Sequence, residues 1–190
     1  MFNTYNYTLF APDNTAMEKA YAAGLPKWAD VVAMFEKYMQ KVENYNENRA
    51  DDDPEYEDDA EDQANQARAK KMITQIRDFI RYHFVTNSVY ADNTVEGGRY
   101  QSLSSDATGV SKEVLLSGGN GQIVITDRMK GGHSVTVKAD DKSKIVNKMT
   151  RDYWFNSSKL TATAIETSSF CAVHQISEPL YYDESGRFDK

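Results

Sequence analysis

The sequence has a single cysteine and no long apolar run, so it lacks the residues that form disulfides and membrane-spanning helices. Its single cysteine, Cys171, excludes an intramolecular disulfide and a thiolate metal cluster made by this chain alone. No window of about 18 consecutive apolar residues occurs, so we expect no transmembrane segment. Residues 1–10 lack the basic and apolar regions of a signal peptide. Basic residues are also in deficit, with 22 Lys and Arg against 29 Asp and Glu, and the net charge of -7 opposes binding to nucleic acid.

Sequence signatures of catalysis are missing as well. The serine pairs, such as Ser168-Ser169, lack the Gly-x-Ser-x-Gly turn of serine hydrolases. The glycine runs lack the Lys-Ser/Thr that follows in phosphate-binding loops. Cys171 lies within an apolar strand pattern, which favours an inert buried thiol over a nucleophile. Serine hydrolase and nucleotide-binding activities are therefore not expected.

What is present is enough apolar material for one core, since 40% of the 190 residues are hydrophobic and 12% are aromatic. Residues 5–10 alternate between apolar and polar side chains before Pro12, a pattern typical of a half-buried strand. Asp13 or Asn14 then supplies an N-cap for a helix that ends at Gly24. The chain thus begins with a strand that leads directly into a short helix.

A helical region follows over residues 26–84. From Trp28 the apolar positions fall at helical spacing and predict one face that packs against the core. Residues 43–62 are dominated by carboxylates and predict an exposed acidic loop. Helical spacing returns over residues 65–84, so the two helices are expected to pair across that loop.

The second half of the chain is expected to be mostly sheet, because short β-type runs alternate there with glycine-containing turns. Residues 145–149 fit either a helix or a strand. The predicted strands are Tyr100–Leu103, Val114–Leu116, Gln122–Thr126, Ser134–Val137, Leu160–Glu166 and Cys171–Ile176.

Three separated stretches resemble motifs of the fasciclin domain family. Residues 7–17 resemble its first signature box, in which a strand ending in Phe-Ala-Pro leads into a capped helix. Residues 80–85 resemble the internal Tyr-His motif, and residues 168–180 resemble the second box, a closing strand that carries a histidine. Their order along the chain makes the set specific. The matching positions are Phe10, Pro12, Asp13, Asn14, Tyr82, His83, His174 and Pro179.

The resemblance implies an α+β fold, a fasciclin-like wedge in which helices pack on a β-sandwich, with residues 26–84 as a helical insertion that carries the acidic loop. It implies a single domain over residues 1–190. The family usually has helices before its first box, so we expect an N-terminal part of the domain to be missing. Within the family, the positions of Tyr82 and His83 help to organise the fold near the second box.

The resemblance also sets the functional expectation: a non-catalytic extracellular domain for adhesion or scaffolding, with a protein or glycan at the cell surface as its partner. The chain looks most like versions from bacterial surface lipoproteins, which implies an outer-membrane location through a lipid anchor. The alternative is an accessory lipoprotein subunit of a TonB-dependent nutrient uptake complex, which would bind outer-membrane transporter subunits and a glycan or peptide. No cofactor is expected.

A metal-dependent enzyme or sensor, centred on His83, His174 and the acidic loop, is the least favoured hypothesis. His83 and His174 lie in apolar patterns typical of buried structural histidines, and His133 is expected to be a turn residue. The acidic run from Asp51 suggests calcium, but Tyr56 stands where an EF-hand loop requires glycine. A solvated acidic loop is therefore predicted, with electrostatic steering toward a basic partner as the sharper alternative.

Overall fold

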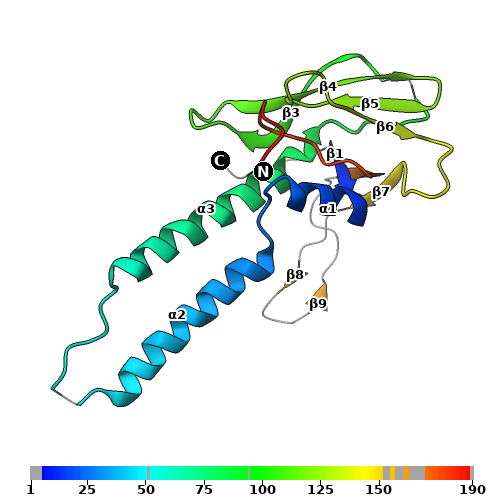
Figure 1. Ribbon diagram of the computed structural model, residues 1–190. Coiled ribbons are helices and arrows are strands. Elements are labelled where there is room, and N and C mark those ends of the chain that lie inside the picture. Colours follow the sequence, from blue (N-terminus) through cyan, green and yellow to red (C-terminus); the bar gives the residue numbers. More distant parts are fainter. Residues whose placement is uncertain are drawn as a thin grey trace.

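The computed structural model describes residues 6–50, 52–93, 95–151, 155–156, 161–162 and 170–188. A body of strands carries a long two-helix arm that projects away from it (Figure 1). In chain order the elements are β1 (Asn6–Pro12), α1 (Asn14–Ala22), α2 (Trp28–Asn48), α3 (Ala60–Tyr82), β2 (Phe84–Thr86), β3 (Gly98–Ser105), β4 (Ser111–Gly119), β5 (Gln122–Thr126), β6 (Ser134–Lys138), β7 (Lys148–Arg151), β8 (Phe155–Asn156), β9 (Thr161–Ala162) and β10 (Phe170–Ile176).

Eight of these strands form one mixed sheet in the order β6-β5-β4-β3-β2-β1-β10-β7, and β8 pairs with β9. The pairing of β1 with β10 is parallel, whereas the other strand pairs in the described residues are antiparallel. The sheet curls, so that β10 also contacts β6. Helices and a curled mixed sheet together confirm the predicted α+β class.

Local sequence patterns account for the hairpins. In β5 the alternation buries Ile123 and Ile125 while their neighbours stay at the surface. The connection from β4 to β5 is the two-residue turn Asn120-Gly121, where both residues have positive φ, as a type I′ turn requires. The predicted strands within β3, β4, β5, β6 and β10 are confirmed. Of the predicted strand at 160–166, only β9 belongs to the described residues.

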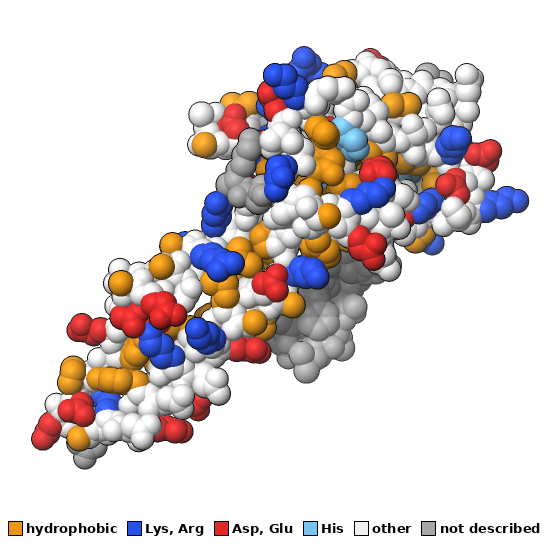
Figure 2. All heavy atoms as spheres, viewed as in Figure 1, with side chains coloured by type: hydrophobic (Ala, Val, Ile, Leu, Met, Phe, Trp, Pro, Cys, Tyr) orange, Lys and Arg blue, Asp and Glu red, His pale blue; other side chains and the backbone are white. Residues whose placement is uncertain are grey.

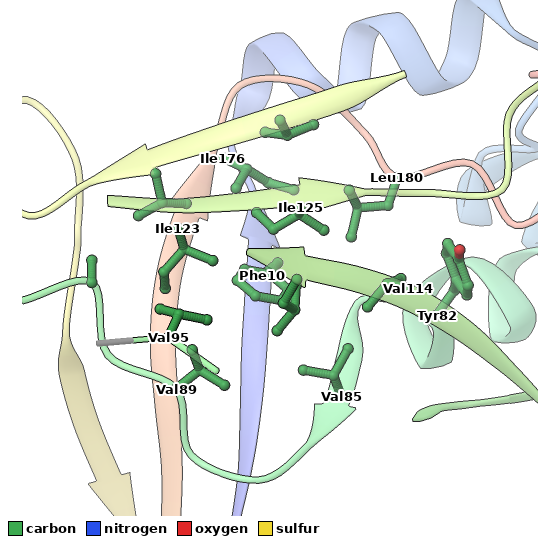
Figure 3. Close-up of a cluster of buried hydrophobic side chains, with 14 residues drawn as sticks. Phe10, Tyr82, Val85, Val89, Val95, Val114, Ile123, Ile125, Ile176 and Leu180 are labelled. Carbon is green, nitrogen blue, oxygen red and sulfur yellow. The ribbon is translucent and has the colours of Figure 1, made fainter. Parts of the chain in front are cut away.

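The main core lies inside the curl of the sheet, where side chains from β1, β2, β4, β5, β6 and β10 meet (Figure 3). Tyr82, from the end of α3, closes one end of this core. A second, smaller cluster joins α1 to the base of the arm through Ala20, Leu25, Phe79 and Phe188. These two clusters anchor the base of α3 to the body, so the arm has a firm attachment.

The structure corrects two predictions for the helical region. The apolar face of α2 does not pack against the core, because the helix points away from the body and buries only Val31. The exposed acidic loop is present but shorter than 43–62, since α2 continues to Asn48 and α3 begins at Ala60. Carboxylates at the start of α3 stabilise that helix, because the N-terminal end of a helix carries partial positive charge. None of the described helices combines the length and apolar character needed to cross a bilayer.

Candidate functional site

The residues predicted from the fasciclin motifs meet where β1, β10 and the end of α3 come together. Phe10 lies opposite His174 in the parallel pairing, with their ring centroids 5.9 Å apart. The Phe10 amide donates a hydrogen bond of 2.9 Å to the carbonyl oxygen of His83. Three segments that are far apart in the sequence are therefore in direct contact. We call this contact region the junction.

His83 is buried in the junction, where it is 1% exposed. Its Nε2 accepts a hydrogen bond of 3.0 Å from the Leu180 amide, so the ring proton is on Nδ1. Nδ1 in turn donates to the carbonyl oxygen of Phe79 over 2.8 Å. Burial lowers the pKa of His83 to about 4, so the ring is neutral at physiological pH.

His174 is bound in the same manner. Its Nδ1 accepts a hydrogen bond from the Asn147 amide at 3.2 Å, and its Nε2 donates to the carbonyl oxygen of Val89 at 2.8 Å. Burial lowers the pKa of this histidine as well. Both nitrogens of each buried ring are thus occupied by backbone groups. Neither ring can bind a metal or transfer a proton without breaking a buried hydrogen bond.

The remaining motif residues surround this pair. Asp13 is the N-cap of α1, since its carboxylate accepts the Ala16 amide at 2.9 Å. The same carboxylate forms an ion pair with Lys144 and accepts a hydrogen bond from Ser177, and these contacts hold the pKa of Asp13 well below its usual range. Asn14 begins α1 and is exposed, so the cap is Asp13 alone.

Two further motif positions are prolines at the ends of segments, and a third, Tyr82, attaches the end of α3 to the sheet. Pro12 ends β1 opposite Ile176, and Pro179 is buried directly before Leu180. Tyr82 is fully buried, and its hydroxyl donates to the carbonyl oxygen of Glu113 at 3.1 Å. Burial raises the pKa of this phenol. All eight positions lie in or beside the junction.

His133 lies in the connection between β5 and β6, as predicted, and it also makes a structural contact, because its Nδ1 lies 2.7 Å from Oδ2 of Asp127. The buried Asp127 carboxylate also accepts the amides of Met129 at 2.9 Å and Tyr181 at 2.7 Å. This set attaches the C-terminal segment to the turn between β5 and β6. Sequence reasoning missed Asp127, since an acidic residue at a strand end is usually a solvated turn residue.

No group of three or more His, Cys, Asp or Glu side chains could hold a metal ion within the described part of the chain. Cys171 is buried in β10, and its thiol contacts the carbonyl oxygen of Ala172 at 3.5 Å. The thiol and the two junction histidines therefore belong to the packed interior of the body.

The arm, which comprises α2, α3 and their connection, is held together at its far end by a polar cluster. The Lys41 ammonium lies 2.8 Å from carboxylate oxygens of both Asp59 and Asp62, and the Tyr56 hydroxyl donates to Asp62. Asp59 and Asp62 also form a capping box at the start of α3. The Tyr38 hydroxyl donates to Asp58 at 2.8 Å. We call these residues the tip cluster.

The ion pair with Lys41 lowers the pKa of Asp62 to about 2, and the same contact lowers the pKa of Asp59. These carboxylates are therefore ionised near neutral pH and hold the helices together at the tip.

Between the tip cluster and the body the two helices leave an apolar crevice of about 700 Å³. Val31, Val32 and Phe35 of α2 and Ala69 and Ile73 of α3 line it. In the space-filling view, hydrophobic side chains run along the arm between charged ones (Figure 2). The crevice is open to solvent along its length, so it is a surface feature of the arm and no part of the core.

The exposed apolar side chains of α2 form a continuous row. Trp28 is 59% exposed, Phe35 64% and Met39 49%, and Val32 completes the row. We call these four residues the outer seam. Their spacings of four, three and four residues place them on one face of the helix. Large apolar surfaces of this kind mark interaction sites in soluble proteins, so the outer seam and crevice are the candidate binding surface.

No protein-family model matches this chain, and a search among curated proteins gives no match either. The arm and the junction are therefore the features from which a function can be inferred.

Proposed function

We propose that this chain is a non-catalytic binding or scaffolding domain that recognises another macromolecule through the outer seam of its arm. One observation carries the proposal: four large apolar side chains stand exposed on a helix that begins just after the buried Leu25 and is bound to α3 through Lys41. A solvent-exposed apolar row is unfavourable in water unless a partner covers it. At 21 residues, α2 is about 30 Å long, which suits contact with a protein surface.

The non-catalytic part of the proposal is supported by how the candidate reactive groups are bonded. His83 and His174 use both ring nitrogens within the core, and Cys171 is buried. Asp127 and His133 have the pairing of a general-base dyad, but each Asp127 oxygen also accepts a backbone amide, from Met129 in the turn and from Tyr181 in the C-terminal segment. We interpret these groups as structural.

The fasciclin-type identity of the body and its place outside the cytoplasm are part of the same proposal. Their support is the junction, where the three motif stretches converge. A second candidate is the accessory role in an outer-membrane nutrient uptake complex. The projecting arm favours it, because such a form reaches a neighbouring subunit while the body stays apart.

Site-specific photo-crosslinking in the cells from which the chain derives tests the proposal. A photoreactive phenylalanine analogue at Phe35 is compared with the same analogue at Val110, which is 63% exposed on the β3–β4 loop. We expect macromolecular adducts from Phe35 and few from Val110. Equal adduct yields at both positions, or adducts to lipid alone, would contradict a protein-binding arm.

A further inference from the structure

The spacing of apolar residues on α2 indicates the kind of partner. The face of α2 that meets α3 and the segment before it carries Val31, Met34, Tyr38, Lys41 and Tyr45, with spacings of three, four, three and four residues. The outer seam repeats the same alternation on a second face of the helix. Alternating spacings of three and four residues are typical of helices packed in coiled coils and bundles. The first face meets α3, whereas the outer seam lies at the open side of the crevice, where Trp28, Val32 and Phe35 line it and yet stay exposed.

The second face therefore fits another helix better than a flat surface or a small ligand. A helix inserted along the outer seam would also enter the apolar crevice beside Ile73, which is 42% exposed. Helical hairpins that carry two such faces assemble into four-helix bundles in antiparallel arrangements.

The charges of the arm identify which helix would fit. Residues 43–62, at the far end, hold eleven Asp and Glu against one Arg, which gives a net charge of -10. Residues 68–81 of α3, toward the body, hold five Lys and Arg against one Asp, which gives +4. Two arms side by side in the same direction would bring their acidic ends together and repel. Two arms in opposite directions would place each acidic end along the basic segment of the other.

From these observations we propose that the occupant of the outer seam is a second copy of this chain, with two arms packed antiparallel as a four-helix bundle. This inference rests on the proposed function, because it names the partner of the same surface. A two-fold axis near Phe35 would set Trp28 of one copy against Met39 of the other. The outer seam of each copy would then contact the outer seam of its partner. The arrangement is self-complementary, as a symmetric dimer interface requires.

The available area agrees with a reversible dimer. An aromatic side chain has roughly 150–250 Å² of surface, so the exposed parts of the outer seam and its neighbours amount to on the order of 600 Å² per copy. A stable interface buries about 800 Å² per partner. The arms alone thus supply most of the area that a stable interface buries. Attraction between the acidic and basic segments adds to the stability of the dimer, and salt weakens this attraction.

Sedimentation velocity of the purified full chain, at concentrations up to about 100 µM, tests the inference. We expect a concentration-dependent dimer that weakens several-fold between roughly 50 and 500 mM salt. The Phe35→Lys variant should weaken the dimer by about 30-fold or more, because central aromatic residues dominate interfaces. Val110→Lys is the matched control and should leave the dimer unchanged, with both variants folded by circular dichroism.

A charge exchange tests the antiparallel direction. One variant carries Glu47→Lys, Glu55→Lys and Glu57→Lys at the acidic end, and a second carries Lys70→Glu, Arg77→Glu and Arg81→Glu on α3; all six positions are exposed. The first variant leaves the acidic end at -4, and the second leaves the α3 segment at -2. In antiparallel arms the first variant should therefore self-associate more weakly than the wild type, and the second more weakly still. In parallel arms the first variant would lose repulsion between the acidic ends, so stronger self-association of that variant than of the wild type would refute the antiparallel arrangement.

The outcomes also separate this inference from the proposed function. A wild-type chain that stays monomeric at low salt, while Phe35 still crosslinks to a different protein in cells, would overturn the second copy as occupant and leave the binding arm in place. A monomeric chain with no Phe35-specific adduct would overturn both.

Discussion

Protonation of His83 gives the junction a measurable dependence on pH. Burial lowers the pKa of this ring from 6.5 to about 4. Below pH 6.5 the unfolded chain therefore binds a proton at this position that the folded chain does not. The free energy of unfolding must fall as the pH drops from 6.5 toward 4, and the contribution is fully lost below the folded pKa. Its total is about 3 kcal/mol, of which about 2 kcal/mol is lost by pH 5.

Urea unfolding of the wild type and of His83→Gln at pH 7 and pH 5 measures this effect. The Gln side chain keeps an acceptor for the Leu180 amide, but it does not titrate and it loses the bond to Phe79. At pH 7 the variant should be less stable by about 1–3 kcal/mol. Between pH 7 and pH 5, however, it should lose about 2 kcal/mol less than the wild type does.

The pH window matters for the interpretation. Asp13 and Asp62 have lowered pKa values, so their contributions to stability are complete above pH 4 and fall only at lower pH. Between pH 7 and pH 5, His174 also lowers the free energy of unfolding as the pH falls, because its pKa is lowered in the same way. The variant retains His174, so this contribution is the same in both proteins. If the wild type and His83→Gln lost the same free energy over this window, the claim that His83 is buried in its neutral form would be refuted.

Two further predictions concern caps and the tip cluster. Asp13→Ala should lower the free energy of unfolding by about 1–2 kcal/mol, because it removes the N-cap of α1 and the acceptor for Lys144. Asp13→Ser keeps the N-cap and should lose less stability. Thermal or urea unfolding measures both changes. Lys41→Met should speed amide hydrogen exchange at the start of α3 while exchange in β5 stays unchanged. Equal exchange rates at the arm tip in the wild type and the variant would contradict the claim that the tip cluster holds the two helices together.

Much of the β half was predictable because its signals are local. The alternation around Ile123 and the turn Asn120-Gly121 are both contained within a few residues, so the sequence alone specifies that hairpin. The parallel pairing of β1 with β10 is different, since it joins residues from opposite ends of the chain. No periodicity reports such a contact. The resemblance names Phe10 and His174 in two separate motifs, and the structure shows that they lie opposite each other.

For the candidate site, the sequence pattern predicted the helix but not what its apolar face contacts. Helical spacing from Trp28 correctly predicted a helix with an apolar face, but periodicity does not state what that face contacts. The expectation of core packing was the ordinary outcome for such a face, and the length of α2 overturned it. A helix of 21 residues attached only at its base extends beyond the body, so most of its apolar side chains have no core within reach.

The tip cluster explains how the apolar crevice stays open. Two helices with apolar facing sides would ordinarily close together to exclude water, which would bury Ile73 against Val32 and remove the binding surface. Here Lys41, Asp59 and Asp62 fix the spacing at the far end, while Phe79 fixes α3 at the base. Because both ends are held, the crevice is preorganised, and a partner helix can enter without first reordering the arm. Two carboxylates of the acidic segment, Asp59 and Asp62, therefore act with Lys41 to keep the proposed binding surface accessible.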